Sequence, residues 1–479
     1  MRKIAIVGGG ISGLSAAFSI EQQRRAGAQV DYILFESSPR FGGVLVTDQV
    51  DRCLVEAGPD SFLTEKPWAA DLCRQLGLAD QLIGSNDADR KTYILVNGRL
   101  VVMPDGLMFM VPTKILPTVL SPLFTVGTKL RMAREWFHPP HKANGDETVA
   151  ALVERHYGPE MVDRLADPLL SGVYGGEANQ LSVRAVLPRF AEMEAQHGSL
   201  GRAMLASRKK MAHVTKGPTR PLFTSLKNGM QQMVDALLSS LSQSSLRAST
   251  PVTDLRRAPE GWIVAAGGRS DFFDAVILAV PSQAAAALLQ STSPDLSVEL
   301  SAIQYSSSVT LTLGYDQKVR ESLPAGFGFL APRSEGKRML ACTFVHNKFP
   351  HRAPPDRALI RCFLGGARDQ EILDSTDDQI VNIARKELRE IIGLQADPLF
   401  GRVYKWRGAM AQYGVGHLER LERIDHLRSE LAGLYLAGNG YRGIGVPDCV
   451  RSGSDAARDS LAGLGITRPL ASSDAKQPA

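Results

Sequence analysis

The sequence predicts an α/β fold built on a parallel sheet, and three observations at the start of the chain predict it. Residues 3–7 (KIAIV) are an apolar run of strand length, and residues 11–26 carry apolar side chains at helical spacing. Gly27 ends that helix, and residues 30–35 (VDYILF) are rich in strand formers. The three segments together have the size and order of a βαβ unit.

The turn between the first strand and the helix contains Gly8, Gly10 and Gly13 in the pattern G-x-G-x-x-G. Gly8 permits a tight turn, Gly10 lets a pyrophosphate approach the backbone, and Gly13 lets helix and strand pack closely. The helix N-terminus offers unpaired N–H groups and a positive dipole end to the phosphates. We therefore expect a Rossmann-type nucleotide site. The contacts expected from this turn are Gly8, Gly9, Gly10, Ile11, Ser12 and Gly13.

An acidic residue, Glu36, ends the second strand 23 residues after Gly13. A carboxylate there accepts hydrogen bonds from ribose hydroxyls and repels a 2′-phosphate, so NADP is disfavoured. Ser37, which follows, is expected to contact the same part of the nucleotide. These features do not separate FAD from NAD.

Two further glycine-rich segments favour FAD. Arg40, Gly43 and Val44 follow Glu36 closely, in an E-x-x-x-R-x-G-G pattern that provides a cation for phosphate and space for an extended dinucleotide. Near the far end, residues 438–447 (GNGYRGIGVP) connect a predicted strand to a helix whose first turn suits proline. A second helix N-terminus would favour negative charge on a reduced flavin ring.

The nucleotide signals at both ends of the chain imply a discontinuous domain with insertions. We assign residues 1–66, 216–290 and 402–465 to an FAD-binding domain and residues 67–110 and 291–401 to an α+β substrate-binding domain. Residues 111–215 are assigned to a helical insertion and residues 466–479 to a disordered tail. Within them, we expect a strand pair at 92–103, a helix at 376–393, a strand at 433–439 and a polar linker at 206–221.

Composition excludes several function classes. The net charge of +5 is too small to indicate a nucleic-acid partner. The five cysteines have no C-x-x-C spacing and the nine histidines have no metal-ligand spacing, so no metal site is expected and a reducing cytoplasm fits best. Residues 111–124 are apolar but contain three prolines, which exclude one long straight helix. Basic residues surround this segment, so it is interpreted either as part of the substrate pocket or as peripheral contact with the inner face of a membrane.

The glycine-rich segments resemble the flavin amine oxidase superfamily, and further blocks resemble the porphyrinogen oxidases of haem biosynthesis. The resemblance runs from Ile4 to about Ala462. The blocks are EAGPDSF (56–62), DPLLSGVYGGEANQLSVRA (167–185), GFGFLAP (326–332), CTFVHNKFPHRAP (342–354), GVGHL (414–418) and GNGYRGIGVPDCVRSG (438–453).

The resemblance implies FAD as cofactor, a porphyrinogen as substrate and oxygen as electron acceptor. It also implies further cofactor contacts: Gly58, Pro59, Asp60 and Ser61 at the flavin, Val252 at the adenine, Trp406 near the cofactor, and Asn439, Ile444, Gly445 and Val446 at the flavin end. No side chain stands out as a general base. The resemblance suggests that a backbone carbonyl near Gly172 orients or receives the pyrrole N–H proton.

The substrate carries propionates, so basic partners are expected. Arg90, Lys91 and Arg184 lie in blocks that resemble pocket segments. Thr92 stands where some protoporphyrinogen oxidases have an arginine, and relatives acting on coproporphyrinogen III tend to lack that arginine. This difference favours coproporphyrinogen III over protoporphyrinogen IX. A downstream ferrochelatase is then a candidate partner, and the oligomeric state stays open.

Two other classes of protein remain as alternatives. An amine oxidase or carotenoid desaturase on the same scaffold is the second enzyme interpretation, although the C-terminal glycine run offers Tyr441 without a clear aromatic pair. A non-catalytic FAD-binding scaffold is the third, and it would bind FAD without oxidising a porphyrinogen.

Overall fold

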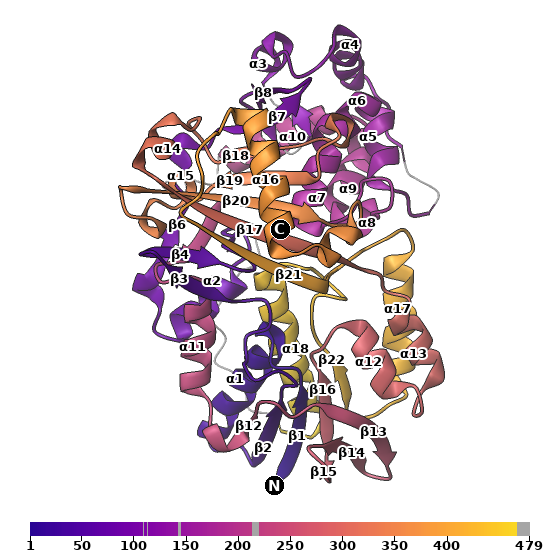
Figure 1. Cartoon of the computed structure of the whole chain (residues 1–479). Helices are drawn as coiled ribbons and strands as arrows, with labels where there is room; N and C mark the ends of the chain where they lie inside the picture. The colour runs from indigo at the N-terminus through magenta and orange to yellow at the C-terminus, as the bar shows by residue number, and fades with distance from the viewer. Residues whose placement is uncertain (109, 113, 142–144, 213–219, 467–479) are drawn as a thin grey trace.

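A computed structural model describes residues 1–108, 110–112, 114–141, 145–212 and 220–466 (Figure 1). One end of the molecule is a parallel sheet with the strand order β12, β2, β1, β16, β22. The strands are β12 (Leu246–Arg247), β2 (Val30–Phe35), β1 (Arg2–Val7), β16 (Ala275–Leu278) and β22 (Leu434–Leu436). Ile4 pairs with Tyr32 on one side and with Ala275 on the other. The first and last strands of the chain thus share one sheet, although the predicted domain boundaries themselves remain predictions.

Both faces of this sheet are covered, which explains why its strands read as continuous apolar runs. One face packs on α1 (Ile11–Arg25), α2 (Trp68–Gln75), α11 (Gln231–Ser240) and α18 (Val446–Gly463). The other face packs on β13 (Val252–Ala258), β14 (Gly261–Ala266), β15 (Arg269–Phe273), α12 (Ser282–Leu289), α13 (Pro294–Ser301) and α17 (His417–Ser429). The helices α1 and α18 lie side by side, although they come from opposite ends of the chain (Figure 1).

A seven-stranded sheet forms the centre of the other half. Its order is β21 (Phe400–Ala411), β17 (Tyr305–Asp316), β20 (Arg357–Gly365), β19 (Met339–Phe344), β18 (Gly328–Leu330), β7 (Thr92–Val96) and β8 (Arg99–Val102). All neighbours are antiparallel except β18 and β7. The helix α16 (Asp377–Ile392) covers one face, begins with a Thr376–Gln379 capping box and ends at a left-handed Gly393. The predicted strand pair at 92–103, helix at 376–393 and strand at 433–439 are therefore confirmed.

Short antiparallel strands connect the two halves. They are β3 (Thr47–Val50) with β4 (Cys53–Glu56), and β5 (Phe62–Leu63) and β6 (Leu82–Gly84) on either side of β11 (Phe223–Leu226). The segment that follows β4 contains the expected flavin contacts 58–61. These strands place that segment between the nucleotide sheet and the seven-stranded sheet.

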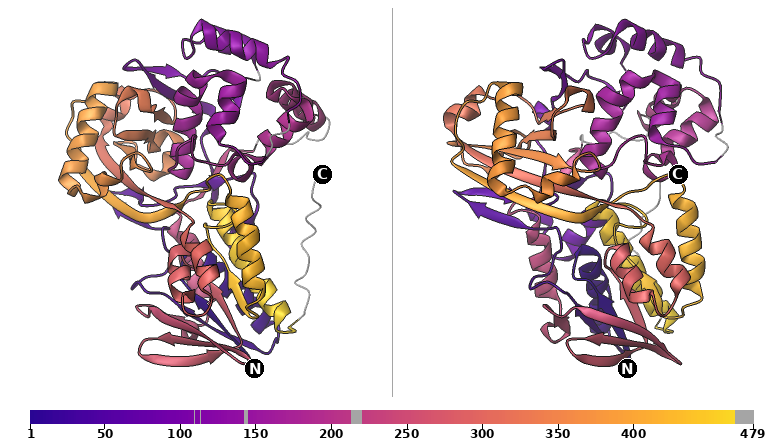
Figure 2. Two further views of the ribbon diagram at one scale, coloured as in Figure 1. Left: turned by 90° about the vertical axis from the view of Figure 1, so that its right-hand side faces the viewer. Right: turned by 45° about the vertical axis from the view of Figure 1, so that its right-hand side comes forward.

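Residues 115–141 and 145–212 are mainly helical and project away from the nucleotide sheet (Figure 2). The helices are α3 (Ile115–Leu120), α4 (Val126–Glu135), α5 (Val149–Tyr157), α6 (Pro159–Met161), α7 (Asp167–Tyr174), α8 (Val183–Val186), α9 (Pro188–His197) and α10 (Leu200–Ala212), with a π-helical segment at Val162–Ala166. The linker prediction is wrong for residues 206–212, because α10 continues through them. Lysine, arginine, methionine and alanine are good helix formers, and they outweigh the polarity of this stretch. The predicted disordered tail, beyond residue 466, lies outside the described residues.

Candidate functional site

The turn after β1 has the shape that a phosphate group needs. Gly8 has φ +106°, and a Cβ at Gly13 would lie 1.9 Å from the Gly8 carbonyl oxygen, so neither position accepts a side chain. A Cβ at Gly10 would have no neighbour within 4 Å. Gly10 is also the N-cap of α1, with no side-chain cap and no acidic residue in the first turn. The turn thus combines tight packing behind the backbone with open space and unsatisfied N–H groups in front of it.

The Glu36 carboxylate lies beside this turn at the end of β2. It accepts hydrogen bonds from the Gly9 N–H (2.7 Å) and the Ser38 N–H (2.8 Å), and the Ser37 hydroxyl lies 3.2 Å away. These contacts fix the carboxylate where a ribose would bind. The segment that leads into Val252 lies next to it, because the Thr250 N–H donates to the Glu36 carbonyl at 2.8 Å. The expected ribose and adenine contacts are therefore neighbours.

The second glycine pair packs directly on the first. The Gly42 N–H donates to the Gly9 carbonyl at 2.8 Å, and a Cβ at Gly43 would lie 3.3 Å from Gly10 Cα. The exposed Arg40 guanidinium donates to the carbonyls of Gly43 and Phe41, within its own loop. The Val44 carbonyl packs against Gly58, because a Cβ at Gly58 would lie 1.9 Å from the Val44 carbonyl oxygen.

The C-terminal glycine run meets the same region through α18. A Cβ at Gly453 would lie 2.0 Å from the Ser12 carbonyl oxygen, so glycine lets α18 contact the first turn of α1. Gly445 is the N-cap of α18, and Ile444 and Val446 flank it. Asp448 lies in the first turn, where the dipole favours a carboxylate, and Lys66 neutralises it at 2.6 Å.

Asn439, near the start of the C-terminal glycine run, is held in place by Tyr413. The Tyr413 hydroxyl donates to the Asn439 carbonyl at 2.7 Å and accepts from the Gly443 N–H at 2.8 Å. The Asn439 amide donates to the Ala409 carbonyl of β21 at 2.9 Å. This network connects the C-terminal glycine run to the seven-stranded sheet.

The expected flavin segment, residues 58–61, is anchored by three neighbouring strands of that sheet, β21, β17 and β20. The Trp406 indole N–H donates to the Ala57 carbonyl at 2.9 Å, and the Thr310 hydroxyl donates to the same carbonyl at 2.5 Å. The Arg361 guanidinium donates to the Gly58 carbonyl. Trp406 therefore has a defined role in positioning this backbone, whichever group contacts its ring.

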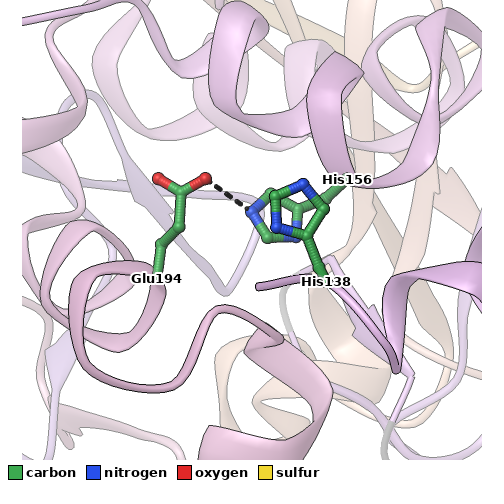
Figure 3. Close-up of side chains that lie close together, drawn as sticks. All are labelled: His138, His156 and Glu194. Carbon is green, nitrogen blue, oxygen red and sulfur yellow. Dashed lines mark hydrogen bonds and ion pairs between the residues drawn. The ribbon is translucent and has the colours of Figure 1, made fainter. Parts of the chain in front are cut away.

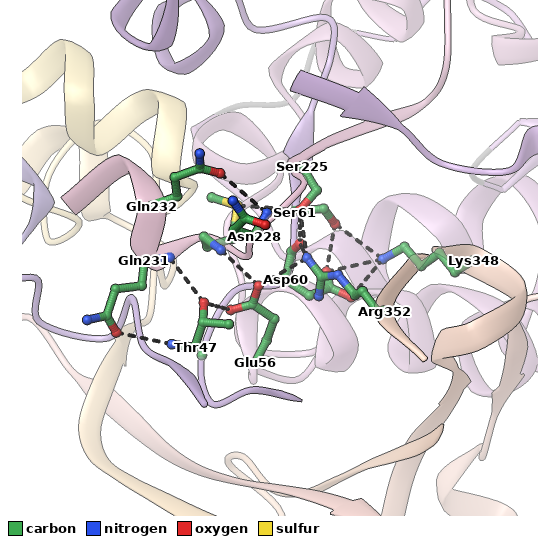
Figure 4. Close-up of polar contacts among 12 residues, drawn as sticks. Thr47, Glu56, Asp60, Ser61, Ser225, Asn228, Gln231, Gln232, Lys348 and Arg352 are labelled. Atoms are coloured by element: carbon green, nitrogen blue, oxygen red, sulfur yellow. Dashed lines mark hydrogen bonds and ion pairs between the residues drawn. The ribbon is translucent and has the colours of Figure 1, made fainter. Parts of the chain in front are cut away.

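Asp60 belongs to a cluster of charged side chains in the interior of the protein, next to Ser61 (Figure 4). Lys348 Nζ is 3.2 Å from both carboxylate oxygens of Asp60, and Arg361 lies 3.8 Å away. Arg352, which is 1% exposed, pairs with Glu56 at 3.0 Å and donates to the Asp60 carbonyl at 2.8 Å. Burial raises the pKa of Asp60, but Lys348, Arg361 and Arg352 outweigh it and hold that pKa well below its usual range.

This cluster has three cations and two anions, so it carries one excess positive charge when all five groups are ionised. The Nε atoms of Arg352 and Arg361 are buried without a hydrogen-bond partner. Burial lowers the pKa of Lys348 and raises the pKa of Glu56. Net positive charge beside the expected flavin segment favours an anionic ligand or a reduced, anionic ring.

The predicted substrate residues lie in two places. Arg90, Lys91 and Thr92 follow one another into β7, with Arg90 and Lys91 exposed and Thr92 paired with Gly328 of β18. Arg184, on α8, forms a 2.6 Å ion pair with Glu419 of α17 on an exposed surface. Gly172 is exposed in the last turn of α7, where backbone carbonyls lack partners within the helix. The roles of these residues in substrate binding and proton transfer stay predictions.

Sequence reasoning missed the buried cations and Tyr413. Lys348 and Arg352 lie inside the block 342–354, but charged residues in a connecting segment are usually solvated. Arg361 gave a clearer signal, because it is a charged residue within an otherwise apolar strand, ALIRCFL. A charge there indicates a buried partner.

Comparison with known proteins agrees with this architecture. Residues 11–461 match the family model described as flavin-containing amine oxidoreductase, and the chain belongs to that family. The chain is 33% identical to a coproporphyrinogen III oxidase of Bacillus subtilis, over 96% of this chain and 98% of the relative. It is 27% identical to protoporphyrinogen oxidase 2 of Arabidopsis thaliana, over 95% and 93% of the two chains. A crystal structure from Exiguobacterium, of a candidate protoporphyrinogen oxidase, superimposes with a TM-score of 0.86 at 28% identity over 97% of this chain and 99% of that one.

The family and the geometry together define an FAD-dependent oxidoreductase. The open backbone at Gly10, the uncapped start of α1 and the fixed Glu36 carboxylate fit the pyrophosphate and ribose of FAD. In the part of the chain that the structure describes, every helix is too short or too polar to cross a membrane.

Proposed function

We propose that this protein is a porphyrinogen oxidase of haem biosynthesis that converts coproporphyrinogen III to coproporphyrin III with FAD and molecular oxygen. The observation that carries the proposal is the extent of the similarity. It covers 96% of the chain, and so includes the nucleotide sheet, the seven-stranded sheet and the helical segment as one unit. A shared nucleotide fold alone would not support a substrate.

The reaction removes six hydrogens from the macrocycle in three two-electron steps. Each step removes a hydride from a bridge carbon and one proton, and tautomerisation between the steps brings the total to one hydrogen from each of the four bridge carbons and two pyrrole N–H hydrogens. Three molecules of oxygen become three molecules of hydrogen peroxide. Bound FAD would supply the hydride acceptor. The protein itself has to position the macrocycle, exclude water and accept a proton. The backbone carbonyl of Gly172 is our candidate for the group that orients or receives the pyrrole N–H proton.

We favour coproporphyrinogen III because it carries four carboxylates, two more than protoporphyrinogen IX. Arg90 and Lys91 are exposed just before the start of β7, where they could bind carboxylates by charge-assisted hydrogen bonds; Arg90 lies 3.9 Å from Asp87. Thr92 leaves this position without the arginine that some protoporphyrinogen oxidases have. The similarity to the Arabidopsis protoporphyrinogen oxidase makes protoporphyrinogen IX the second candidate.

An amine oxidase activity is supported only by the fold. The Tyr413 ring stacks on His417 at 4.1 Å, and its hydroxyl is occupied by Asn439 and Gly443. The Tyr441 hydroxyl is buried without a hydrogen-bond partner. The Tyr413 hydroxyl therefore bonds to the backbone, and the Tyr441 hydroxyl is buried. Tyr413 and Tyr441 thus give no support to an aromatic cage for an amine.

The cellular setting is proposed together with the activity. We place the enzyme in the cytoplasm with peripheral contact to the inner face of the membrane through α3 and α4. Leu116, Leu120 and Val126 of these helices are 68%, 73% and 73% exposed, an unusual state for apolar side chains in one region. Coproporphyrin III is a substrate for metal insertion, so a ferrochelatase is the proposed downstream partner.

The function is tested by turnover with three substrates. FAD-loaded protein receives coproporphyrinogen III, protoporphyrinogen IX or a primary diamine in air, and porphyrin fluorescence and peroxide are measured. We expect both porphyrinogens to react, with a higher initial rate for coproporphyrinogen III and three peroxides per porphyrin. Peroxide from the diamine with no porphyrin from either porphyrinogen would overturn the assignment, and a higher rate with protoporphyrinogen IX would reverse the preference.

A further inference from the structure

Two histidines and a glutamate from three different parts of the helical segment, His138, His156 and Glu194, lie close together (Figure 3). His138 follows α4, His156 lies on α5 and Glu194 lies on α9, and one potential ligand atom from each falls within 4.8 Å of the others. His156 and Glu194 are buried, whereas His138 is half-buried. The site is thus closed on one side and open to solvent through His138.

Each imidazole is oriented by an acceptor on its Nδ1 atom. His138 Nδ1 donates to the Pro139 carbonyl at 3.1 Å, since a carbonyl can only accept. His156 Nδ1 lies 3.2 Å from Glu135 Oε1, and Glu135 is itself fixed by the Ser199 hydroxyl at 3.0 Å and the Leu200 N–H at 2.6 Å. Metal binding would use the Nε2 atom of each ring, because Nδ1 of each ring already has an oxygen partner. This arrangement of carbonyl or carboxylate behind histidine is typical of metal sites.

The separation between two of the three proposed ligands is close to the separation of ligands around a metal. His156 Nε2 lies 3.0 Å from Glu194 Oε1. Two ligands of a tetrahedral Zn²⁺ ion, each about 2.0–2.1 Å from the metal, are separated by roughly 3.3 Å. A movement of a few tenths of an ångström would therefore convert the present contact into one edge of a coordination tetrahedron.

Three carboxylates and one guanidinium lie at or beside the proposed ligands. Arg155 donates to Glu147 at 2.6 and 2.9 Å and to Glu194 at 2.8 and 3.0 Å. Glu135 and Glu194 are buried, whereas the side chains of Glu147 and Arg155 are partly exposed. Arg202 is exposed and donates to the backbone carbonyls of His138 and His197. The two buried carboxylates, Glu135 and Glu194, need positive charge nearby, to which a bound divalent cation would add.

We propose that His138, His156 and Glu194 bind a divalent transition-metal cation, with Zn²⁺ the best match and water as the fourth ligand. Two imidazoles and one carboxylate form a donor set that suits zinc better than magnesium or calcium. The ion would tie the segment after α4 to α5 and α9, and so would stabilise the helical segment. This proposal is independent of the porphyrinogen activity.

The test measures Zn²⁺ binding to the FAD-loaded full-length protein. After equilibrium dialysis against ZnCl₂, metal analysis should give one Zn²⁺ per chain, and the ion should raise the melting temperature more than MgCl₂ does. His138→Ala should weaken Zn²⁺ binding more than about tenfold, because even the loss of a residue that only supports a ligand costs 10- to 100-fold. This variant leaves both glutamate contacts of His156 in place, so folding is preserved.

Two controls separate a specific site from surface binding and from a plain ion pair. His426→Ala removes an exposed histidine that lies 3.7 Å from Glu430 on α17, and it should leave Zn²⁺ binding unchanged. Glu135→Gln should weaken binding about 10- to 100-fold by removing the carboxylate behind His156. Equal Zn²⁺ binding by wild type and His138→Ala would overturn the proposal. So would ¹⁵N NMR spectra in which both ring nitrogens of His156 stay protonated at saturating Zn²⁺.

Discussion

At the scale of single residues, the charges around Asp60 make the sharpest prediction. Replacing Asp60 by Asn leaves three buried cations, Lys348, Arg352 and Arg361, against Glu56 alone, so the excess charge rises from +1 to +2. Lys348→Met lowers the excess to zero and leaves the Asp60 carboxylate 3.8 Å from Arg361, with Arg352 still donating to the Asp60 carbonyl. Because removing one partner of a buried pair costs about 3–5 kcal/mol, Asp60→Asn should lose that much stability and Lys348→Met distinctly less.

Urea denaturation of the FAD-free proteins measures this difference without a contribution from the cofactor. Asp455→Asn breaks an exposed ion pair with Arg458 and serves as the control, with a change within about 0.5 kcal/mol. A larger loss of stability in Lys348→Met than in Asp60→Asn would contradict the claim that the excess positive charge of the cluster determines its stability.

A second residue, His346 of α15 (Val345–Lys348), predicts a pH dependence. Its side chain is 1% exposed, Nδ1 accepts from the Leu359 N–H at 3.1 Å, and Nε2 has no partner. Burial lowers the pKa of His346 to about 4, and Arg320 acts in the same direction. Between pH 4 and the unfolded pKa of about 6.5, the unfolded chain therefore binds a proton that the folded chain does not.

The folded state should thus be fully stabilised above about pH 6.5 and should lose about 2–3 kcal/mol as the pH falls to 4. The measurement is the urea midpoint as a function of pH, for wild type and for His346→Asn, whose amide oxygen can still accept from Leu359. The variant should show a shallower decline over this range. Parallel curves would assign the acid sensitivity to other groups.

At the scale of elements, the start of α1 separates cofactor binding from folding. A Cβ at Gly10 meets open space, so Gly10→Ala should keep the stability of the FAD-free protein but obstruct the pyrophosphate. A Cβ at Gly13 would lie 1.9 Å from the Gly8 carbonyl, so Gly13→Ala should disturb the packing of α1 on β1 as well. We expect FAD affinity to fall more than about tenfold in both variants, which corresponds to about 1.4 kcal/mol.

FAD titration and urea denaturation of the FAD-free variants distinguish the two effects. Only Gly13→Ala should lower the urea midpoint. Unchanged FAD affinity in Gly10→Ala would mean that the pyrophosphate does not lie against this turn.

The pair α3 and α4 predicts a surface interaction. Leu120 and Phe137 are 73% and 81% exposed, and Lys114 and Arg134 are exposed nearby. Apolar side chains beside cations suit an anionic lipid surface, where each basic residue contributes about 1 kcal/mol. Wild type should sediment with phosphatidylglycerol vesicles at low salt and be released by high salt, whereas Leu120→Glu and Phe137→Glu should stay in solution. Val298→Glu, at an exposed apolar residue of α13, should behave as wild type.

At the scale of the whole molecule, local sequence patterns were sufficient to predict the helices and strands but not how these elements assemble. The βαβ unit, the strand pair at 92–103 and the helix at 376–393 follow from periodicity and capping residues close together in the sequence. The order of the seven-stranded sheet does not, because it pairs β7 in parallel with β18, more than 200 residues later. Pairing at that distance leaves no local pattern.

The same difference applies to the candidate site. The glycines and Glu36 were predictable, because each has a backbone or charge requirement within one turn. The partners of Asp60 were not, since Lys348 lies 288 residues away and its charge is compensated only in the folded chain. The His138, His156 and Glu194 cluster was missed for a similar reason, because three different segments contribute to it.

The central claim, that the two ends of the chain hold FAD next to a porphyrinogen, is tested most directly by anaerobic reduction of the flavin. FAD-loaded protein in excess is mixed with coproporphyrinogen III without oxygen, and absorbance at the flavin band and porphyrin fluorescence are followed together. The account predicts that the flavin bleaches with three flavins reduced for each coproporphyrin III formed. A flavin that stays oxidised with coproporphyrinogen III and protoporphyrinogen IX, yet bleaches with a primary amine, would contradict it.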